Sequence, residues 1–330
     1  MSKVSSLNAA LGQRRNLVLG FSMLIVLLVA GAATIDGFLS VVNLRSMLLL
    51  GAFLGLASIG QTFSALVGGL DLSIAYVIGA ANVLMVFLMQ IGISAPLAVV
   101  MIIAFGLLVG IVNGLLSFRL QNQSLVVTLG VGFIVIGLAQ IVVSFGEAST
   151  SQSGAIPEWI SNFASANGES FGLPVSPIVV LWLVISILIV LAVKYTWFGR
   201  SIYALGGNRN AARLMRISER HRWVSVYAIS GAFAATTGIA LLGFSGGSFV
   251  HVGDPYLFLT VAAVAVGGTS LLGGRGGYGS TVLGVLVLIA LQSLLVGLGF
   301  NSNGQQFVLG LLIVPLVGLY ARNPSLRNQI

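Results

Sequence analysis

The chain has 330 residues, of which 57% are hydrophobic and 7% are charged. Because a soluble protein of this length carries far more charge on its surface, the composition excludes a soluble globular fold. A net charge of +8 would suggest nucleic acid as the partner of a soluble protein. Here we attribute the charge to membrane topology and expect no nucleic-acid partner.

Long apolar runs recur along the whole chain, each near the roughly 20 residues that a helix needs to cross a bilayer. Backbone groups in lipid must be bonded internally, and the runs are continuous rather than alternating, so each predicts a helix and not a strand of a β-barrel. The ten predicted spans are 17–34, 46–66, 73–91, 96–117, 124–144, 176–193, 224–244, 257–272, 279–299 and 306–321. They predict an all-α polytopic membrane protein with one transmembrane domain over residues 1–330.

Basic residues gather on one side of the membrane when the N-terminus is placed in the cytoplasm. Cytoplasmic loops retain Lys and Arg during insertion, so this asymmetry sets the orientation. It predicts both termini inside, a basic cytoplasmic segment at 194–223 and an extracytoplasmic loop at 145–175. Only Arg45 falls outside, and the basic residues placed inside are Lys3, Arg14, Arg15, Arg119, Lys194, Arg200, Arg209, Arg213, Arg216, Arg220, Arg222, Arg275, Arg322 and Arg327.

Residues that carry catalysis or bind cofactors are scarce. The chain has no cysteine and only two histidines, His221 and His251, which excludes thiolate sites and disfavours zinc. No G-x-x-x-x-G-K-[ST] sequence occurs, and the glycine-rich run 267–279 has no lysine, so no nucleotide-binding loop is expected. We expect no catalytic residue, no metal and no cofactor, and transport driven by ATP would need another chain to bind the ATP.

Asp71 is the only acid closely flanked on both sides by long apolar spans. An ionisable group near the bilayer is costly, and it marks a functional site by default. The alternative is that Asp71 or Ser73 caps the helix predicted to begin near Ile74. The two interpretations are compatible if Gly68 and Gly69 bend the chain at the inner mouth of a pathway.

Uncharged polar residues inside the spans also have two interpretations. They bond one helix to another, or they line a conduit that suits a neutral, hydroxyl-rich solute. Together with Asp71, the pathway candidates are Gln61, Asn82, Asn113 and Thr128. The scarcity of buried acids and histidines argues against a proton relay.

A short sequence echo links two distant parts of the chain. Residues 67–73 read Val-Gly-Gly-Leu-Asp-Leu-Ser, and residues 266–272 read Val-Gly-Gly-Thr-Ser-Leu-Leu. Both stretches are predicted to end a span on the cytoplasmic side. Transporters often contain repeated halves, although one short echo does not establish a repeat.

The basic cytoplasmic segment contains a predicted short helix. Asn208 is its expected N-cap, and Arg209, Arg213, Arg216 and Arg220 are spaced to form one stripe on it. The neighbouring apolar residues 211, 212 and 215 lie elsewhere on its surface, where they can make a small apolar contact. The stripe suits either anionic lipid headgroups or a cytoplasmic protein that docks on the helix.

Four sequence blocks resemble the membrane permease of ribose-type ABC importers, and the similarity covers nearly the whole chain. The blocks are Gly68-Gly69-Leu70-Asp71-Leu72-Ser73, Val126-Val127-Thr128-Leu129-Gly130, the block from Gly199-Arg200 to Ala211-Ala212-Arg213, and the block from Val266-Gly267-Gly268-Thr269 to Gly273-Gly274. The resemblance implies a multi-pass permease of the bacterial inner membrane with about ten helices. Its expected partners are a second permease copy or a paralogue, a cytoplasmic ABC ATPase and an extracytoplasmic solute-binding protein, in addition to the lipid bilayer.

The resemblance also implies the substrate class and one site. It implies import of a small neutral solute, a monosaccharide. The third block resembles the family's coupling segment, which rests in a groove of the ATPase. That role falls on Gly206, Gly207, Asn208, Ala211, Ala212 and Arg213.

Two departures keep the identity of the solute open. Ala75 stands where the family often has Gly, and Gln123-Ser124 stand where it often has Pro. The alternative function is an ion-coupled secondary transporter. It would need a coupling-ion site near the bilayer midplane, for which Asp71 is the one candidate.

Overall fold

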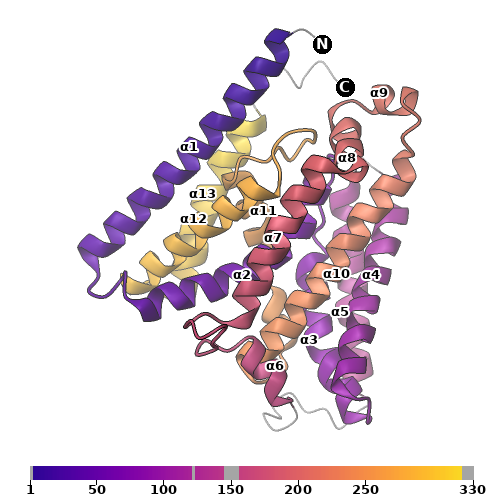
Figure 1. Cartoon of the computed structure of the whole chain (residues 1–330). Coiled ribbons are helices and arrows are strands. Elements are labelled where there is room, and N and C mark those ends of the chain that lie inside the picture. Colours follow the sequence, from indigo (N-terminus) through magenta and orange to yellow (C-terminus); the bar gives the residue numbers. More distant parts are fainter. Residues whose placement is uncertain (1–2, 121–122, 145–155, 322–330) are drawn as a thin grey trace.

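A computed structural model describes residues 3–120, 123–144 and 156–321, with side chains between residues 17 and 311. The described part of the chain is all-α and contains no strand beyond one isolated bridge between Ser170 and Leu173 (Figure 1). The helices are α1 (Lys3–Thr34), α2 (Val41–Leu66), α3 (Ile74–Gln90), α4 (Ala95–Arg119), α5 (Ser124–Ser144), α6 (Glu158–Phe163), α7 (Pro177–Tyr195), α8 (Trp197–Gly207), α9 (Arg209–Leu214), α10 (Glu219–Ser245), η2 (Val250–Gly253), α11 (Tyr256–Val266), α12 (Tyr278–Gly297) and α13 (Ser302–Ala321).

Seven of these helices are long and apolar enough to cross a membrane: α1 over Leu17–Thr34, α2, α4, α5, α7, α10 and α12. The chain is therefore an all-α polytopic membrane protein. Each of the ten predicted runs coincides with a helix, but α3 has 17 residues and α11 only 11. The predicted span 257–272 was too long, because α11 ends at Val266 and Gly268 turns the chain with a φ of +81°.

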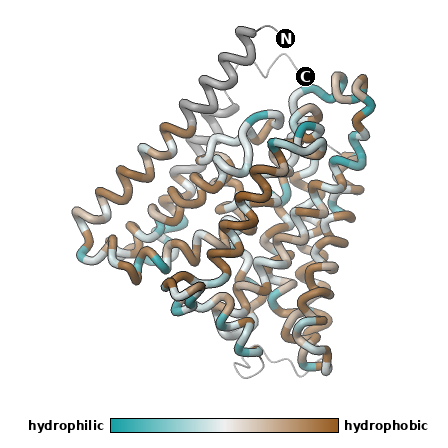
Figure 2. The backbone as a smooth tube through the Cα atoms, in the orientation of Figure 1, coloured by the Kyte–Doolittle hydropathy of each residue, from teal (hydrophilic) through white to brown (hydrophobic). Residues whose placement is uncertain are grey.

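Helix α2 lies at the centre of the bundle, and its residues from Gly51 to Leu66 are all buried. Helix α10 packs along α4 at backbone contact. A side chain added at Gly106 or Gly110 of α4 would collide with the carbonyl oxygens of Gly231 and Tyr227 of α10. Small residues allow this close approach where lipid supplies no hydrophobic force between helices. The outer helices α4, α5 and α7 instead expose large apolar side chains. The backbone tube of these helices is largely brown, the colour of hydrophobic residues, in Figure 2.

The bundle has two distinct ends. Helices α8 and α9 lie at the end that also holds the first turns of α1, while α6 lies at the opposite end (Figure 1). Arg45, the one basic residue predicted outside, donates a hydrogen bond of 3.1 Å to the carbonyl of Gly168 in the loop after α6. The predicted extracytoplasmic loop 145–175 is described from residue 156 onward, and its first part lies outside the described residues.

Candidate functional site

The chain turns back into the bundle after α2. Gly68 has a φ of +82° and donates its N–H to the carbonyl of Ala65, and Gly69 donates to the carbonyl of Ser64, both at 2.9 Å. These two bonds form a Schellman ending, which glycine favours because it has no Cβ to clash in the left-handed conformation. The turn directs Asp71 into the protein, where it is 1% exposed.

The Asp71 carboxylate is held by hydroxyl and backbone donors. Its Oδ1 accepts from the N–H of Ser73 at 3.0 Å and from the Ser73 hydroxyl at 2.6 Å, and its Oδ2 accepts from the Ser230 hydroxyl of α10 at 2.6 Å. No ion pair among the described residues involves Asp71. A buried carboxylate is costly unless it is bonded, so these three donors are what the site supplies in place of a cation.

Neither residue makes the predicted cap. Helix α3 begins at Ile74, as expected, but its N-cap Ser73 makes no side-chain bond to the helix. Asp71 bonds to Ser73 itself rather than to N–H groups within the helix. The carboxylate therefore ties the start of α3 to α10.

Two more predicted pathway residues meet the same segment. Asn113 of α4 donates to the Ser73 hydroxyl at 2.7 Å, and Thr128 of α5 accepts from the N–H of Leu72 at 3.0 Å. Asn113 of α4 and Thr128 of α5 thus contact the segment before α3 that carries Asp71, and the three residues form one polar cluster. All three are buried.

Sequence reasoning missed two partners of this cluster, both on α10. Ser230 bonds to Asp71, and the Tyr227 hydroxyl donates to the carbonyl of Leu70 at 3.2 Å. Their signal is weak but present, since both are polar residues three positions apart in the predicted span 224–244, on one face of its helix.

The remaining two pathway candidates lie away from this cluster. Asn82 of α3 donates to the carbonyl of Gly238 at 3.2 Å and accepts from the N–H of Phe249 at 2.8 Å, so it joins α3 to α10 and to the segment before η2. Gln61 of α2 is fully buried, and neither of its amide atoms has a partner among the described residues. The Ser58 hydroxyl, one turn earlier, is also buried without a partner there.

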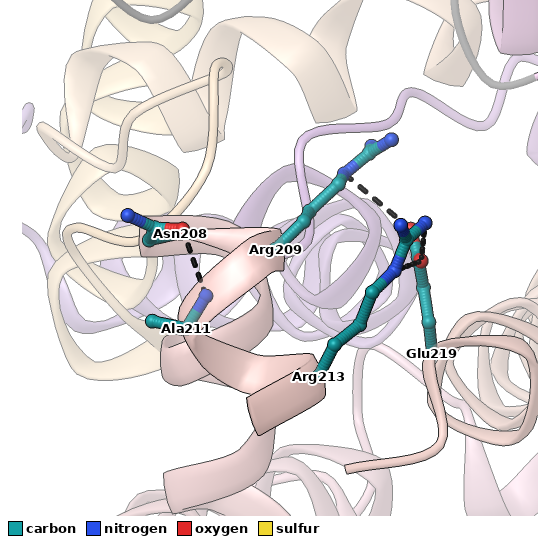
Figure 3. Close-up of polar contacts among 5 residues, drawn as sticks. All are labelled: Asn208, Arg209, Ala211, Arg213 and Glu219. Carbon is teal, nitrogen blue, oxygen red and sulfur yellow. Dashed lines mark hydrogen bonds and ion pairs between the residues drawn. The ribbon is translucent and has the colours of Figure 1, made fainter. Parts of the chain in front are cut away.

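The predicted cap at Asn208 is confirmed. Its Oδ1 accepts from the N–H of Ala211 at 3.0 Å and starts α9 (Figure 3). The predicted arginine stripe on one helix is wrong, because α9 ends at Leu214 and Arg216 has a φ of +56°. The chain then restarts as α10, whose N-cap is Ser218.

The first two arginines of that stripe bind an acid instead. Arg209 and Arg213 extend from α9 toward Glu219 at the start of α10, at 3.6 and 3.0 Å (Figure 3). The Glu219 side chain is only 7% exposed. Arg209 also lies over the Trp223 ring at 5.3 Å. These contacts hold the short helix α9 against α10.

The two neighbouring glycines at the end of α8 have opposite surroundings. A side chain on Gly206 would collide with the carbonyl of Leu66 at the end of α2 and lie 2.7 Å from the nitrogen of Gly274. Gly274 also donates its N–H to that Leu66 carbonyl at 2.9 Å. Gly207 has open space. We call Leu66, Gly206, Gly273 and Gly274 the glycine junction, where α2, α8 and the loop after α11 meet backbone to backbone.

Tyr203 fixes α8 to the same loop. Its hydroxyl donates to the carbonyl of Gly276 at 2.6 Å. Burial raises the pKa of this hydroxyl, so it stays protonated as the donor.

The six predicted coupling residues divide into two groups. Gly207, Asn208, Ala211 and Arg213 are exposed, whereas Ala212 is fully buried within this chain and Gly206 lies in the glycine junction. The most exposed apolar side chain of α8 and α9 is that of Leu214, at 87%, which was not among the predicted coupling residues. Its signal is its place beside Met215 in an otherwise basic segment.

Comparison with known proteins decides the family. Residues 43–317 match the family described as the permease component of the branched-chain amino acid transport system. The chain belongs to this family. It is similar to the probable ABC transporter permease protein YphD of Escherichia coli (strain K12), with 31% identity over 281 residues, 85% of this chain and 82% of YphD.

Two further relatives have names that include a solute. The ribose import permease protein RbsC of Bacillus subtilis (strain 168) is 31% identical over 89% of each chain. The L-arabinose transport system permease protein AraH of Escherichia coli (strain K12) is 31% identical over 88% of this chain and 86% of AraH. No solved structure matches the chain.

Family membership fixes the general role. The chain is the inner-membrane permease subunit of an ABC importer, and an ABC ATPase and a solute-binding protein are the partners that the family implies. ATP hydrolysis belongs to the separate ATPase subunit, so this chain carries no catalytic site. The ion-coupled alternative is set aside.

The permease also has a cavity of about 1200 Å³ between the end of α1, the start of α2, and α11, α12 and α13. None of the five predicted pathway residues lines it. It was not predicted because its walls come from four separate stretches of sequence.

Proposed function

We propose that this permease imports a monosaccharide that a solute-binding protein delivers from outside. The observation that carries the proposal is the similarity to permeases named for ribose and L-arabinose over nearly nine tenths of the chain. The uncharged character of four of the five pathway candidates supports it, because amides and hydroxyls match the donors and acceptors of a sugar.

The experiment is uptake by proteoliposomes that hold the permease, its cognate ATPase and its cognate binding protein. Radiolabelled ribose, arabinose and fructose are tested beside leucine, which represents the solute in the family's description. ATP-dependent uptake of one sugar and none of leucine is the expected result. Uptake of leucine alone would overturn the monosaccharide assignment.

We also propose ten crossings with both termini in the cytoplasm. The bond between Arg45 and the loop after α6 supports it, since the ten-span arrangement places both outside and the structure holds them together. Reporter fusions after Arg119, within 200–222 and after Arg322 are expected to report cytoplasm. A cytoplasmic signal from a fusion within 150–170 would contradict the proposed topology.

The exposed residues Gly207, Asn208, Ala211 and Arg213 are proposed to meet the ATPase, while Gly206 and Ala212 shape the segment from within. Gly207→Val supplies the test, because its side chain enters open space in this chain. We expect normal stability and expression but loss of solute-stimulated ATP hydrolysis. Unchanged hydrolysis and uptake would favour lipid headgroups as the partner of this segment.

The permease is further proposed to act as a dimer with a second copy or a paralogue. Co-expression of tagged and untagged chains with the ATPase tests this. Recovery of the untagged chain with the tagged one indicates a homodimer. Its replacement by a second permease from the native host indicates a paralogue.

Gln61, Asp71, Asn82, Asn113 and Thr128 remain our proposal for the inner pathway. Gln61 and Asn113 support it most, because each has a buried amide atom without a partner among the described residues. Gln61→Leu has a similar volume and removes no bond of the described chain. We therefore expect unchanged or higher thermal stability with reduced uptake, and unchanged uptake would remove Gln61 from the pathway.

A further inference from the structure

The large cavity lies at the end of the bundle opposite to α8 and α9. Its wall on α2 includes Asn43, Ser46 and Met47, all within two residues of Arg45 in the sequence. Arg45 bonds to the loop after α6, so the cavity opens at the end proposed to face outward. The other walls come from Pro255 and Phe258 at the start of α11 and from α12 and α13.

Nine of the 22 residues that line this cavity are polar, although most of its lining surface is apolar. Among the described residues, its polar lining contains amides, hydroxyls and two carboxylates but no Lys, Arg or His. The polar lining residues are Asp36, Asn43, Ser46, Asp254, Gln292, Ser293, Ser302, Gln305 and Gln306. An amide facing hydrocarbon without a partner costs several kcal/mol in the limit of an apolar solvent, so this face requires water or a polar ligand.

Five of these nine side chains have partners, and those of Asp36, Gln292, Ser302 and Gln306 have none among the described residues. Asn43 and Ser293 bond to each other at 3.2 Å, which joins α2 to α12. The Gln305 amide donates to the carbonyl of Phe300 at 3.0 Å. The side chains of Gln292 and Gln306 have no hydrogen bond to a described residue, and they line the cavity from α12 and α13.

Apolar groups complete a surface of mixed character. Met47, Leu50 and Ile289 line the cavity, and the Phe258 ring is 62% exposed. A sugar has C–H faces that pack on such groups and hydroxyl edges that bond to neutral amides. Asp254 bonds to His251 at 3.0 Å, whereas the Asp36 carboxylate has no such partner in the described part of the chain. With no Lys, Arg or His among the described residues of the lining, these carboxylates disfavour an anionic solute.

We propose that this cavity is the entry site where a small, neutral, polyhydroxylated solute first binds the permease after release from the solute-binding protein, with Gln292 and Gln306 as its main free hydrogen-bonding groups. This inference rests on the proposed monosaccharide function. It places the first contact of the solute on α2, α12 and α13 rather than at the buried residues of α2, α3, α4 and α5.

Cysteine labelling tests the site, because the chain has no cysteine of its own. Gln306→Cys and Ser46→Cys are placed in the cavity, and Phe307→Cys is the matched control on α13, exposed but outside the cavity lining. The complete transporter in right-side-out vesicles is treated with a membrane-impermeant maleimide. We expect labelling of both cavity variants, protection by ribose-loaded binding protein, and neither effect at Phe307→Cys.

Uptake supplies the second measurement. Gln292→Ala and Gln306→Ala are each expected to lower ribose uptake about three- to tenfold, the loss of one neutral hydrogen bond, with normal expression and ATPase association. Reaction of the cavity variants with a lipid-soluble maleimide alone would overturn the proposal, since lipid or another chain would then cover the face. Impermeant labelling without protection, combined with normal uptake in the Ala variants, would also overturn it.

The test separates this inference from the proposed function. If the unsubstituted transporter takes up no sugar, the monosaccharide assignment fails on that measurement alone. Access of the impermeant reagent to Gln306→Cys and Ser46→Cys still decides whether the cavity is an aqueous entry site.

Discussion

The ends of α2 and α11 share one backbone geometry and then serve different purposes. Gly68 and Gly268 have φ values of +82° and +81°, and the residue after each donates to a carbonyl five positions earlier, Gly69 to Ser64 and Thr269 to Val264. After α2 the chain buries a carboxylate against α10. After α11 it forms a glycine loop that meets α8 through bare backbone.

The difference teaches that the turn at the helix end does not determine the role of the residues that follow it. The Schellman ending fixes where the helix stops, and the residues that follow decide what the turn presents. One ending presents a side chain, the other presents backbone, and the two meet where Gly274 donates to the carbonyl of Leu66. The comparison can be tested by substitutions of three kinds: at this meeting point, after one helix ending, or at both endings.

Gly206→Val is expected to have the largest effect, because the new side chain enters the glycine junction between the two endings. Collision with the backbone of Leu66 and Gly274 leaves no flexible group to move. We expect a loss of about 3 kcal/mol or more in the free energy of unfolding, measured as a fall in thermal midpoint in detergent. Gly207→Val is the matched control, and an equal loss in both variants would show that the junction is not the cause.

Asp71→Leu keeps the ending of α2 and changes only the side chain that follows it. It removes the acceptor of three hydrogen bonds and leaves the buried N–H of Ser73 without a partner. We expect a loss of about 2–3 kcal/mol in the free energy of unfolding. The position at the same distance after the α11 glycine is Leu271, so Leu271→Ala is the control and should cost clearly less; equal losses would mean that the carboxylate has no special part.

Gly68→Ala and Gly268→Ala sharpen the comparison, because both place a Cβ in the left-handed conformation. Each is expected to cost about 1–2 kcal/mol, and the two losses should be similar. Thermal midpoints of the two variants under the same conditions provide the measurement. A much larger loss at one site would indicate that its surroundings, and not the shared backbone, dominate.

Asp71→Asn has the smallest expected effect on stability, below about 1 kcal/mol. The amide keeps one oxygen for Ser73, and its NH₂ can donate to the Ser230 hydroxyl, which also accepts. Normal stability with reduced uptake would show that transport needs the charge. Normal stability with normal uptake would leave Asp71 a purely structural link between α3 and α10.

The sequence predicts those features that depend on neighbouring residues. Asn208 caps α9 because the cap needs only a side-chain oxygen three residues before an N–H, and α3 begins at Ile74 where the polar residues end. The break at Arg216 was missed because arginine carries no signal for a left-handed conformation. The sequence echo between 67–73 and 266–272 aligns Gly68 with Gly267, but the glycine in the left-handed conformation after α11 is Gly268. The echo is therefore one residue out of register with the structure.

Features that depend on residues far apart in the chain could not be predicted from the sequence. Gly206 and Gly207 are identical and adjacent, and only the packing of α2 and the loop after α11 distinguishes them. Ala212 faces its own chain rather than a partner, because the ion pairs of Glu219 set how α9 lies. Ser230 lies 159 positions from the carboxylate it holds, a pairing that no local pattern contains.

The position of Glu219 gives α10 a mechanical property. Glu219, which holds the two arginines of α9, and Ser230, which holds Asp71, lie on the same uninterrupted helix. Eleven residues at 1.5 Å each separate them by about 16 Å along its axis. The helix has no proline over this length, so it behaves as a stiff rod. A displacement of α9 therefore reaches the start of α3 through one rigid helix, without crossing a loop.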